Sequence, residues 1–369
     1  MRELSARRDD GGDESVARAV FTAASEPQVA PMTGSKGPTS LISADQIERY
    51  VALADAHSVT EEVLRGLALG RVEMPAKVTM NLAEFGLKAW NTAMPAYIES
   101  LGASGFKWVG GFADNREKHG LPYLIATILV QDSSTGYPLA IMDGVHITNL
   151  RTGAVAAIAV QHYARPEPHR LAFVGAGVQA RFALAAIKRV AEIVEVRAYD
   201  INPEATLRFR DHCEREHGIA LVVSDTAEEA VAGADIVITA TTSTSPIVRH
   251  SWMTRGVTAI SIGSQGQEFD DEAVLGADKL VCDSWEQCTH LGELRSFAES
   301  GRLTRADVHA EIGETVADLK SGRETDEEYI LVVPIGLGAL DVALARVAYD
   351  RVTANESVQT FRFFQSSPS

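Results

Sequence analysis

The spacing of apolar and polar positions changes twice along the chain. Residues 43–72 carry apolar side chains at helical spacing, whereas residues 76–150 contain short β-rich runs broken by Gly, Pro, Asn and Asp. From residue 170 onwards, buried strand patterns alternate with helical patterns. This alternation predicts a parallel sheet with helices on both faces. The strands expected there are residues 170–177, 194–200, 220–225, 234–242, 257–263 and 279–284.

Local signals support the helices and turns. Ser43 is a suitable helix N-cap, and Gln46 three residues later completes a capping box. In the β-rich region, "DSSTGYP" (132–138) has the composition of a hairpin turn. An Ala-rich helix is expected at 150–164, where it would link two domains, and a further helix at 335–354. The β-rich runs are residues 77–82, 106–112, 123–132 and 138–144.

Residues 1–40 differ from the rest of the chain. They mix charges and then become rich in Ser, Pro, Gly and Thr, which predicts a disordered tail.

Composition restricts the function classes. The formal charge is -16, from 34 Lys and Arg against 50 Asp and Glu, which argues against a nucleic-acid surface. No apolar run is long enough to span a membrane, and the first residues lack the apolar core of a signal peptide. The three cysteines form no close pair or ligand cluster, and no His, Cys, Asp and Glu spacing indicates a metal. These features predict a cytoplasmic protein with reduced thiols.

The stretch "LAFVGAGVQARFAL" (171–184) contains the clearest chemical motif. Gly175, Gly177 and Ala180 form G-x-G-x-x-A between an apolar strand and a helix. Gly175 permits a tight turn, Gly177 lets a pyrophosphate approach the backbone, and Ala180 lets strand and helix pack closely. The helix N-terminus supplies free N–H groups to the phosphates.

Asp200 ends the next strand, 20 residues after Ala180, at the position of a ribose-binding acid. Its charge would repel a 2′-phosphate, so NAD is favoured over NADP. Thr241, Thr242 and Ser243 follow a later strand, where they either line the cofactor or form a solvated loop.

Together with several other segments, this motif resembles the ornithine cyclodeaminase/mu-crystallin family. The resemblance covers roughly residues 44–350 and is carried by "GRVEMPAK" (70–77), "GFKWV" (105–109), "TGYPLAIMDGVHITNLRTGA" (135–154), "FVGAGVQAR" (173–181), "DSWEQC" (283–288) and "DEEYILVVPIGLGALD" (326–341). It implies an NAD-binding Rossmann domain at 153–318. A second α+β domain, built from residues 41–152 and 319–369, would bind substrate and form a homodimer.

Family chemistry moves a hydride between nicotinamide and the Cα of an α-amino or α-imino acid. The resemblance implies that three cations hold the substrate carboxylate: Lys77, Lys107 and Arg151. Lys77 replaces the usual Arg and gives a point charge rather than a bidentate fork. Lys107 lies on a β-rich run, where desolvation would lower its pKa, and is therefore our candidate for proton exchange at nitrogen. The residues expected at the cofactor are Gly175, Gly177, Val178, Gln179, Ala180, Asp200, Thr241 and Thr242, together with Arg151 and Thr152.

One family residue is missing. Cyclodeaminases carry an Asp after the strand that reads "ISIG" here, whereas Gln265 falls near that position. Gln can neither take a proton nor pair electrostatically with a distal amine. Glu268, Asp270 or Asp271 would have to substitute, but we favour a solvated acidic turn for them.

We therefore expect an amino-acid dehydrogenase or imine reductase, with 2,3-diaminopropionate synthesis as a candidate pathway. The alternatives are an ornithine or lysine cyclodeaminase that releases ammonia, and a non-catalytic cofactor-binding protein. The identity of the substrate stays open. So does the role of Asp341, which either stabilises the closing helix or approaches the nicotinamide.

Overall fold

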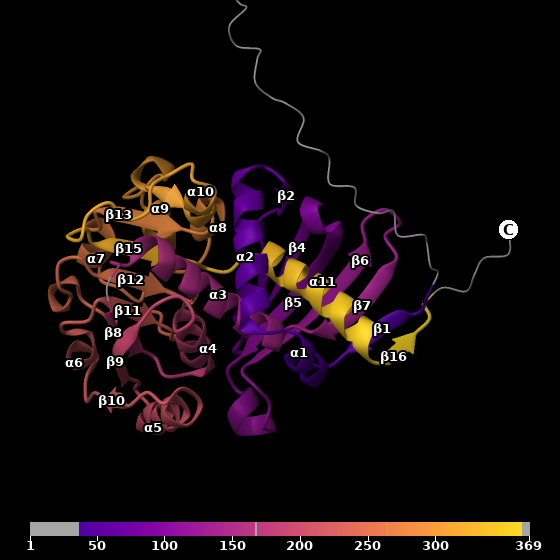
Figure 1. Ribbon diagram of the computed structural model, residues 1–369, viewed down its shortest axis with the longest axis horizontal. Coiled ribbons are helices and arrows are strands. Elements are labelled where there is room, and N and C mark those ends of the chain that lie inside the picture. The colour runs from indigo at the N-terminus through magenta and orange to yellow at the C-terminus, as the bar shows by residue number, and fades with distance from the viewer. Residues whose placement is uncertain (1–36, 167, 264, 364–369) are drawn as a thin grey trace, which may run out of the picture. The chain divides into compact units, whose positions relative to one another are not determined.

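Two β-sheets organise the fold (Figure 1). The structure is a computed structural model that describes residues 37–166, 168–263 and 265–363. The described residues belong to one compact unit, so both sheets can be treated together. None of the described helices combines the length and apolar character needed to cross a bilayer.

The first sheet, which we call the mixed sheet, has the order β16-β1-β7-β6-β5-β4-β2, with β3 also paired to β4. Its pairs are antiparallel except for β1 with β7. The alternation expected of a half-covered sheet is clear on β5, where Lys107 and Val109 are buried while Phe106 and Trp108 are exposed. The strands are β1 Thr39–Ile42, β2 Val72–Glu73, β3 Val78–Asn81, β4 Ala89–Ile98, β5 Ala103–Phe112, β6 Leu124–Asp132, β7 Pro138–Asp143 and β16 Gln359–Phe361.

Helix α11 (Gly338–Asn355) crosses the covered face of the mixed sheet and contacts β4, β5, β6 and β7 (Figure 1). Helices α1 (Ala44–Tyr50) and α2 (Leu53–Ala68) pack beside it. The expected capping box at α1 is confirmed: Gln46 N–H donates to Ser43 Oγ, and Ser43 N–H donates to Gln46 Oε1. The predicted hairpin turn is also confirmed, because it joins the antiparallel strands β6 and β7.

The second sheet, the parallel sheet, has the order β10-β9-β8-β11-β12-β15-β13-β14, and every described pair is parallel. Its order reverses between β8 and β11, which is the switch point where doubly wound sheets bind nucleotides. The strands are β8 His169–Val174, β9 Ile193–Tyr199, β10 Leu221–Val223, β11 Ile236–Thr239, β12 Thr258–Ser261, β13 Lys279–Cys282, β14 Ala310–Glu311 and β15 Ile330–Val333.

Short helices connect these strands. They are α4 Val178–Ile187, α5 Pro203–His212, α6 Ala227–Val231, α7 Asp271–Leu275, α8 Trp285–Cys288, α9 Arg295–Glu299 and α10 Ile312–Val316. Single helical turns lie at η1 Ala83–Phe85, η2 Glu99–Leu101, η3 Asn115–His119, η4 Cys213–His217, η5 His250–Trp252 and η6 Arg305–Asp307.

Helix α3 (Val145–Tyr163) joins the two halves of the fold. It packs against α2 on the side of the mixed sheet and against α4 on the side of the parallel sheet. Every residue from Ile147 to Val160 is buried, which explains why this helix is apolar and Ala-rich rather than amphipathic.

Two boundaries differ from the sequence expectation. Thr39 and Ser40 were assigned to the tail, yet they begin β1, which pairs with β7 and β16; residues 1–36 lie outside the described residues. The second difference is β15, which lies between β12 and β13 of the parallel sheet although we gave residues 319–369 to the other domain. All four residues of β15 are buried, as a central parallel strand requires.

Candidate functional site

The glycine-rich turn follows β8 at the switch point of the parallel sheet. Gly175 has φ +98°, and a Cβ there would lie 2.6 Å from the carbonyl oxygen of Ala240, so only glycine fits. Gly177 precedes α4, and a Cβ on it would meet no atom within 4 Å, which leaves its backbone open to a ligand. Ala180 is fully buried beneath the turn. The turn therefore has the geometry of a phosphate cradle.

Asp200 lies beside this turn. One of its carboxylate oxygens accepts the backbone N–H of Ala176 at 2.8 Å, and the other accepts the N–H of Asn202 at 2.8 Å. The carboxylate is half-buried at the end of β9, the strand next to β8. It is thus fixed at the position where a ribose hydroxyl would meet it.

Other predicted cofactor residues surround the start of α4. Gln179 Nε2 donates to Asn149 Oδ1 at 2.9 Å, while Gln179 Oε1 is buried without a partner among the described residues. Thr152 is buried on α3, and its hydroxyl donates to the carbonyl of Thr148. Val178, by contrast, is 47% exposed at the first turn of α4.

The expectation of a solvated acidic turn after β12 is wrong for Glu268, which is buried, whereas Asp271 is exposed. The carboxylate of Glu268 is 1% exposed and accepts hydrogen bonds from the hydroxyls of Thr239, Thr241 and Ser261. The hydroxyl of Ser261 also lies 3.1 Å from buried Glu293, and burial raises the pKa of Glu293 to about 8. Glu268 thereby ties together the ends of β11 and β12, because these strands supply its donors.

Thr241 is held by this network, since both its N–H and its hydroxyl donate to Glu268. Thr242 is exposed beside it. Asp270 caps α7 by accepting the N–H of Ala273, and Asp271 pairs with Arg302 on the surface.

The three predicted cations, Lys77, Lys107 and Arg151, gather around two buried carboxyl groups. These belong to Asp283 and Asp341. Lys107 on β5 is 1% exposed, and its Nζ donates to Asp341 Oδ2 at 2.7 Å and to Thr148 Oγ1 at 3.3 Å. Arg151 on α3 donates through Nε to Asp341 Oδ1 at 3.4 Å. Asp341 stands in the first turn of α11, so it joins three elements of the fold.

Electrostatics in this cluster are dominated by burial. Desolvation lowers the pKa of Lys107 to about 7, although Asp341 opposes that shift. The nearby cations Lys107 and Arg151 outweigh the desolvation of Asp341 and leave its pKa below the usual value. Lys107 therefore titrates near neutral pH while Asp341 remains a carboxylate.

Lys77 completes the cluster from the segment before β3. Its Nζ donates to the carbonyl oxygen of Ile335 at 3.0 Å. Desolvation lowers its pKa to about 8, with Asp283 opposing the shift and Arg151 adding to it. Asp283 is buried and accepts the N–H of Gly336 at 2.8 Å.

Basic groups outnumber carboxyl groups in this region. Three basic side chains, Lys77, Lys107 and Arg151, lie with two carboxyl groups, Asp283 and Asp341. Burial lowers the pKa of both lysines and raises the pKa of Asp283. The two terminal guanidinium nitrogens of Arg151 have no hydrogen-bonding partner within the described ranges, and its side chain is 10% exposed. A planar fork of this kind suits a carboxylate.

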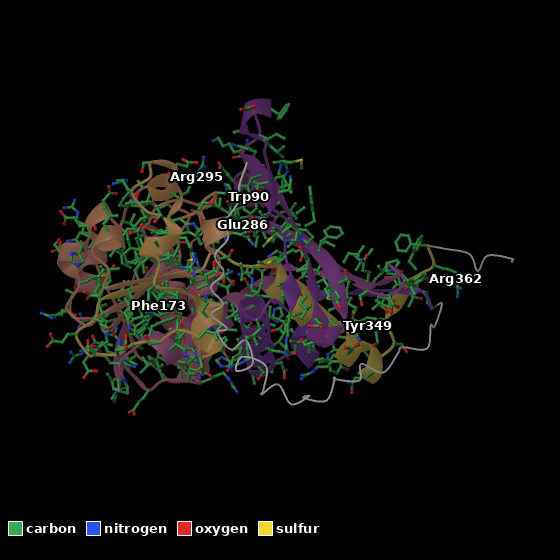
Figure 2. All side chains as sticks on the ribbon, turned by 90° about the horizontal axis from the view of Figure 1, so that it is seen from above. Trp90, Phe173, Glu286, Arg295, Tyr349 and Arg362 are labelled. Carbon is green, nitrogen blue, oxygen red and sulfur yellow. The ribbon has the colours of Figure 1, made fainter. Side chains whose placement is uncertain are left out.

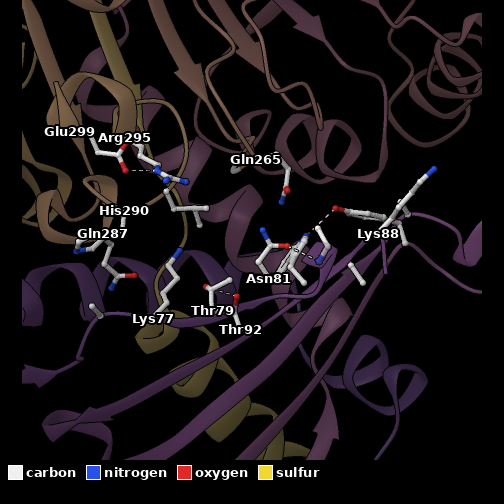
Figure 3. Close-up of a pocket in the computed structure, with 17 residues that line it drawn as sticks. Lys77, Thr79, Asn81, Lys88, Thr92, Gln265, Gln287, His290, Arg295 and Glu299 are labelled. Atoms are coloured by element: carbon white, nitrogen blue, oxygen red, sulfur yellow. Dashed lines mark hydrogen bonds and ion pairs between the residues drawn. The ribbon is translucent and has the colours of Figure 1, made fainter. Parts of the chain in front are cut away.

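A cavity of about 590 Å³ lies next to this cluster, between the mixed sheet and loops of the parallel sheet (Figure 3). Figure 3 shows Lys77 pointing into it from one side and Gln265 from the other. The wall is formed by Ala76, Lys77, Thr79, Asn81, Ala83, Lys88, Ala89, Trp90, Thr92, Ala113, Tyr123, Gln265, Gln287, His290, Leu291, Arg295 and Glu299.

Of the predicted site residues, the structure places Lys77 in the cavity wall, but not Lys107 or Arg151. Those two lie in the buried cluster with Asp341. Sequence reasoning had left Asp341 undecided and had missed Asp283, Gln287 and Arg295. In the sequence, only position pointed to these residues. Asp283 and Gln287 lie within "DSWEQC" (283–288), one of the segments that resemble the family, and Arg295 follows that segment. No group of three or more His, Cys, Asp and Glu side chains in the described ranges could hold a metal ion.

Comparison with known proteins gives consistent results. The model of the ornithine cyclodeaminase/mu-crystallin family matches residues 39–356. An alanine dehydrogenase of Archaeoglobus fulgidus is 38% identical over 330 residues, which cover 89% of this chain and 99% of that protein. A solved archaeal alanine dehydrogenase dimer with bound NAD superimposes with a TM-score of 0.83 at 36% identity, covering 89% of this chain and all of that one. Delta(1)-pyrroline-2-carboxylate reductase of Thermococcus litoralis, solved with NADH and L-proline, gives 0.82 at 32% identity over 86% of this chain and 98% of that one.

The Asp341 cluster generates a stability prediction. Asp341→Asn leaves the buried guanidinium of Arg151 without its counterion and takes from Lys107 the carboxylate that helps it to keep its proton, so we expect a loss of about 3–5 kcal/mol in the free energy of unfolding. Adding Lys107→Met to that variant removes the second basic group that has lost its partner and should recover part of the loss. Urea denaturation measures both effects.

The matched control is Asp114→Asn, which breaks the exposed Asp114–Lys118 pair, where Lys118 is 60% exposed. Solvent screens that pair, so the unfolding midpoint of the Asp114→Asn variant should equal that of the parent protein. Equal effects at Asp341 and Asp114 would contradict the assignment of Asp341 as the buried counterion.

Proposed function

The chain belongs to the ornithine cyclodeaminase/mu-crystallin family, and from that premise we propose that it is an NAD-dependent oxidoreductase acting on the Cα–N bond of a small α-amino or α-imino acid. The proposed reaction is amino-acid dehydrogenation or imine reduction. The observation that carries the proposal is the cluster of buried basic side chains, with the two terminal nitrogens of Arg151 unpaired among the described residues, beside a cavity that also borders the nucleotide half. In this proposal the parallel sheet binds the dinucleotide, and the mixed sheet supplies the substrate cations.

The cofactor residues fit the proposal. Gly175 and Gly177 would hold the pyrophosphate, Asp200 the adenosine ribose, and the segment after β11 the nicotinamide half. When bound, NAD⁺ accepts a hydride from the substrate Cα. Gln179 Oε1, buried without a partner, would accept a hydrogen bond from the cofactor or from a water molecule that accompanies it.

The substrate carboxylate would be held by Arg151. Asp341 fixes its Nε, so the terminal nitrogens are oriented before any ligand arrives. Lys107 is then a positioning residue, because its Nζ acts on Asp341 and Thr148 rather than on the cavity. This revises our sequence-based choice of Lys107 for proton exchange.

We assign proton exchange at the substrate nitrogen to Lys77. Lys77 lines the cavity, and its pKa of about 8 leaves both protonation states populated near neutral pH. During oxidation, neutral Lys77 takes a proton from the substrate ammonium, and the hydride leaves Cα as the C=N bond forms. The products are an iminium acid, NADH and one proton, so charge and electrons balance. An Arg at this position could not exchange that proton, because the pKa of a guanidinium lies far above neutral pH.

The cavity wall favours this chemistry over cyclodeamination. Gln265 lines the cavity where a carboxylate would be needed to meet a distal ammonium group. Glu268 is committed to hydrogen bonds at the ends of β11 and β12 and does not line the cavity. Asp270 and Asp271 cap a helix and pair with Arg302, respectively.

Two substitutions at Lys77 separate proton exchange from charge. We expect Lys77→Met and Lys77→Arg both to lower kcat by at least ~100-fold, because neither can carry the proton. In the parent enzyme, oxidation should accelerate as pH rises through about 8, and reduction should slow over the same range. Initial rates from NADH absorbance across pH 6–10 measure this.

Lys320→Met, at an exposed position away from the cavity, should retain the parent rate. If Lys77→Arg kept full activity, Lys77 would supply only charge. If the parent enzyme converted neither amino acids nor imino acids, the oxidoreductase proposal itself would fail.

Asp200→Asn tests the cofactor assignment. The amide keeps an acceptor for the Ala176 N–H but removes the charge that repels a 2′-phosphate. The preference for NAD over NADP, measured as a ratio of kcat/KM values, should fall at least tenfold. An unchanged ratio would mean that Asp200 does not contact the adenosine ribose.

We also propose a homodimer formed through the mixed sheet. The face opposite α11 exposes large apolar side chains, including Phe106, Trp108 and Ile125. Such a contiguous apolar face is typical of an interface between subunits. The archaeal alanine dehydrogenase noted above is itself a dimer.

The dimer prediction uses the double variant Phe106→Glu with Trp108→Glu. Two carboxylates on this face should prevent association, so light scattering after size exclusion should give the mass of a monomer. Val194→Glu, at another exposed apolar position on β9, should leave the dimer intact. If the double variant still forms a dimer, this face is not the dimer interface.

A cytoplasmic location completes the proposal. All three cysteines are buried as free thiols. Unpaired thiols are typical of proteins in a reducing compartment.

A further inference from the structure

The cavity carries more positive charge than one carboxylate needs. The chain has a formal charge of -16, yet the cavity wall holds Lys77, Lys88 and Arg295 with Glu299 as its one acidic side chain among the described residues. Lys88 points outward at the rim in Figure 3, whereas Lys77 and Arg295 face the interior from opposite sides. Two separated cations therefore point into the same space.

Arg295 lies in the cavity wall, and its side chain is 56% exposed. Its Nε donates to Glu299 Oε1 at 2.8 Å, and Figure 3 shows Glu299 behind it, away from the centre of the cavity. The two terminal nitrogens have no hydrogen-bonding partner in the part of the chain that the structure describes. Arg151 has the same arrangement, with Nε held by Asp341 and the fork unpaired. Each fork presents parallel donors that match a carboxylate.

The remaining wall is polar and includes one unsatisfied buried group. Gln287 is 4% exposed and lines the cavity, and its Oε1 has no hydrogen-bonding partner among the described residues. A buried acceptor without a donor is costly, so a ligand N–H would satisfy it. Trp90, on the mixed sheet, and Arg295, on α9, are both labelled in Figure 2 and line this same cavity.

We propose that the substrate is an α-amino or α-imino acid with a second carboxylate on its side chain. Arg151 holds the α-carboxylate, Arg295 receives the distal carboxylate, and Gln287 accepts from the substrate nitrogen. The inference rests on the proposed oxidoreductase function and names its substrate class. A cavity of about 590 Å³ gives a side chain of this kind more room than alanine needs.

Paired substrates test the inference by activity. With NAD⁺, kcat/KM for L-aspartate or L-glutamate should exceed that for its amide, L-asparagine or L-glutamine, and that for L-alanine by at least tenfold. Arg295→Gln should lower kcat/KM for the preferred diacid at least tenfold, mainly through KM, and should therefore reduce the preference for the diacid over L-alanine. Arg295→Lys keeps the charge but loses the planar pair of donors. Its kcat/KM for the diacid should lie between the values of the parent enzyme and of Arg295→Gln.

The matched control is Arg208→Gln. Arg208 forms the same kind of exposed pair four residues from a glutamate, Glu204, but lies on α5, outside the cavity wall. Its substitution should leave the diacid preference intact.

A binding measurement separates this inference from the proposed function. Succinate should raise the melting temperature of the parent protein more than butyrate at equal concentration, and Arg295→Gln should abolish the difference. If L-alanine is oxidised as well as the diacids and Arg295→Gln changes nothing, the second carboxylate site is wrong while the oxidoreductase function stands. If no substrate is turned over but succinate still binds through Arg295, the function is wrong and the carboxylate site stands.

Discussion

The buried carboxylate of Asp341 is the constraint on which the site depends. It stands in the first turn of α11 and meets Lys107 from β5 and Arg151 from α3. A lone charge at this depth would be prohibitively costly, so these three side chains hold their elements in one arrangement. The same contact leaves the two terminal nitrogens of Arg151 unpaired among the described residues, so in our proposal the packing of the mixed sheet also prepares the substrate site.

Burial explains the proposed chemistry as well as the fold. Desolvation brings the pKa values of Lys77 and Lys107 close to neutrality, so each lysine can gain or lose a proton where an exposed lysine would stay charged. Of these two lysines, Lys77 lines the cavity and Lys107 does not. In our proposal, a lysine at position 77 supplies a proton acceptor that an arginine would not supply. On the opposite side, Glu268 secures the loops at which the cofactor would meet the substrate.

Local signals in the sequence predicted local structure well. The capping box at Ser43, the hairpin after β6 and the glycine at position 175 each depend on near neighbours or on backbone geometry, and the structure confirms each of them. Long-range contacts were harder to predict. Glu268 looks like a surface acid in sequence, and only the convergence of β11 and β12 reveals the donors that bury it. Likewise, β15 was not recognised as a strand of the parallel sheet, because it enters that sheet between strands that precede it in the chain.

The central claim is that hydrogen passes directly from the substrate Cα to the nicotinamide in the cavity beside Lys77 and Arg151. The most direct test supplies amino acids deuterated at Cα, with aspartate, glutamate and alanine as the panel, together with NAD⁺, and then measures the mass of the NADH formed. Direct transfer predicts NADH that is one mass unit heavier, with the deuterium retained at C4 of the nicotinamide. NADH that forms without deuterium, or amino acid consumed with no NADH at all, would contradict the account.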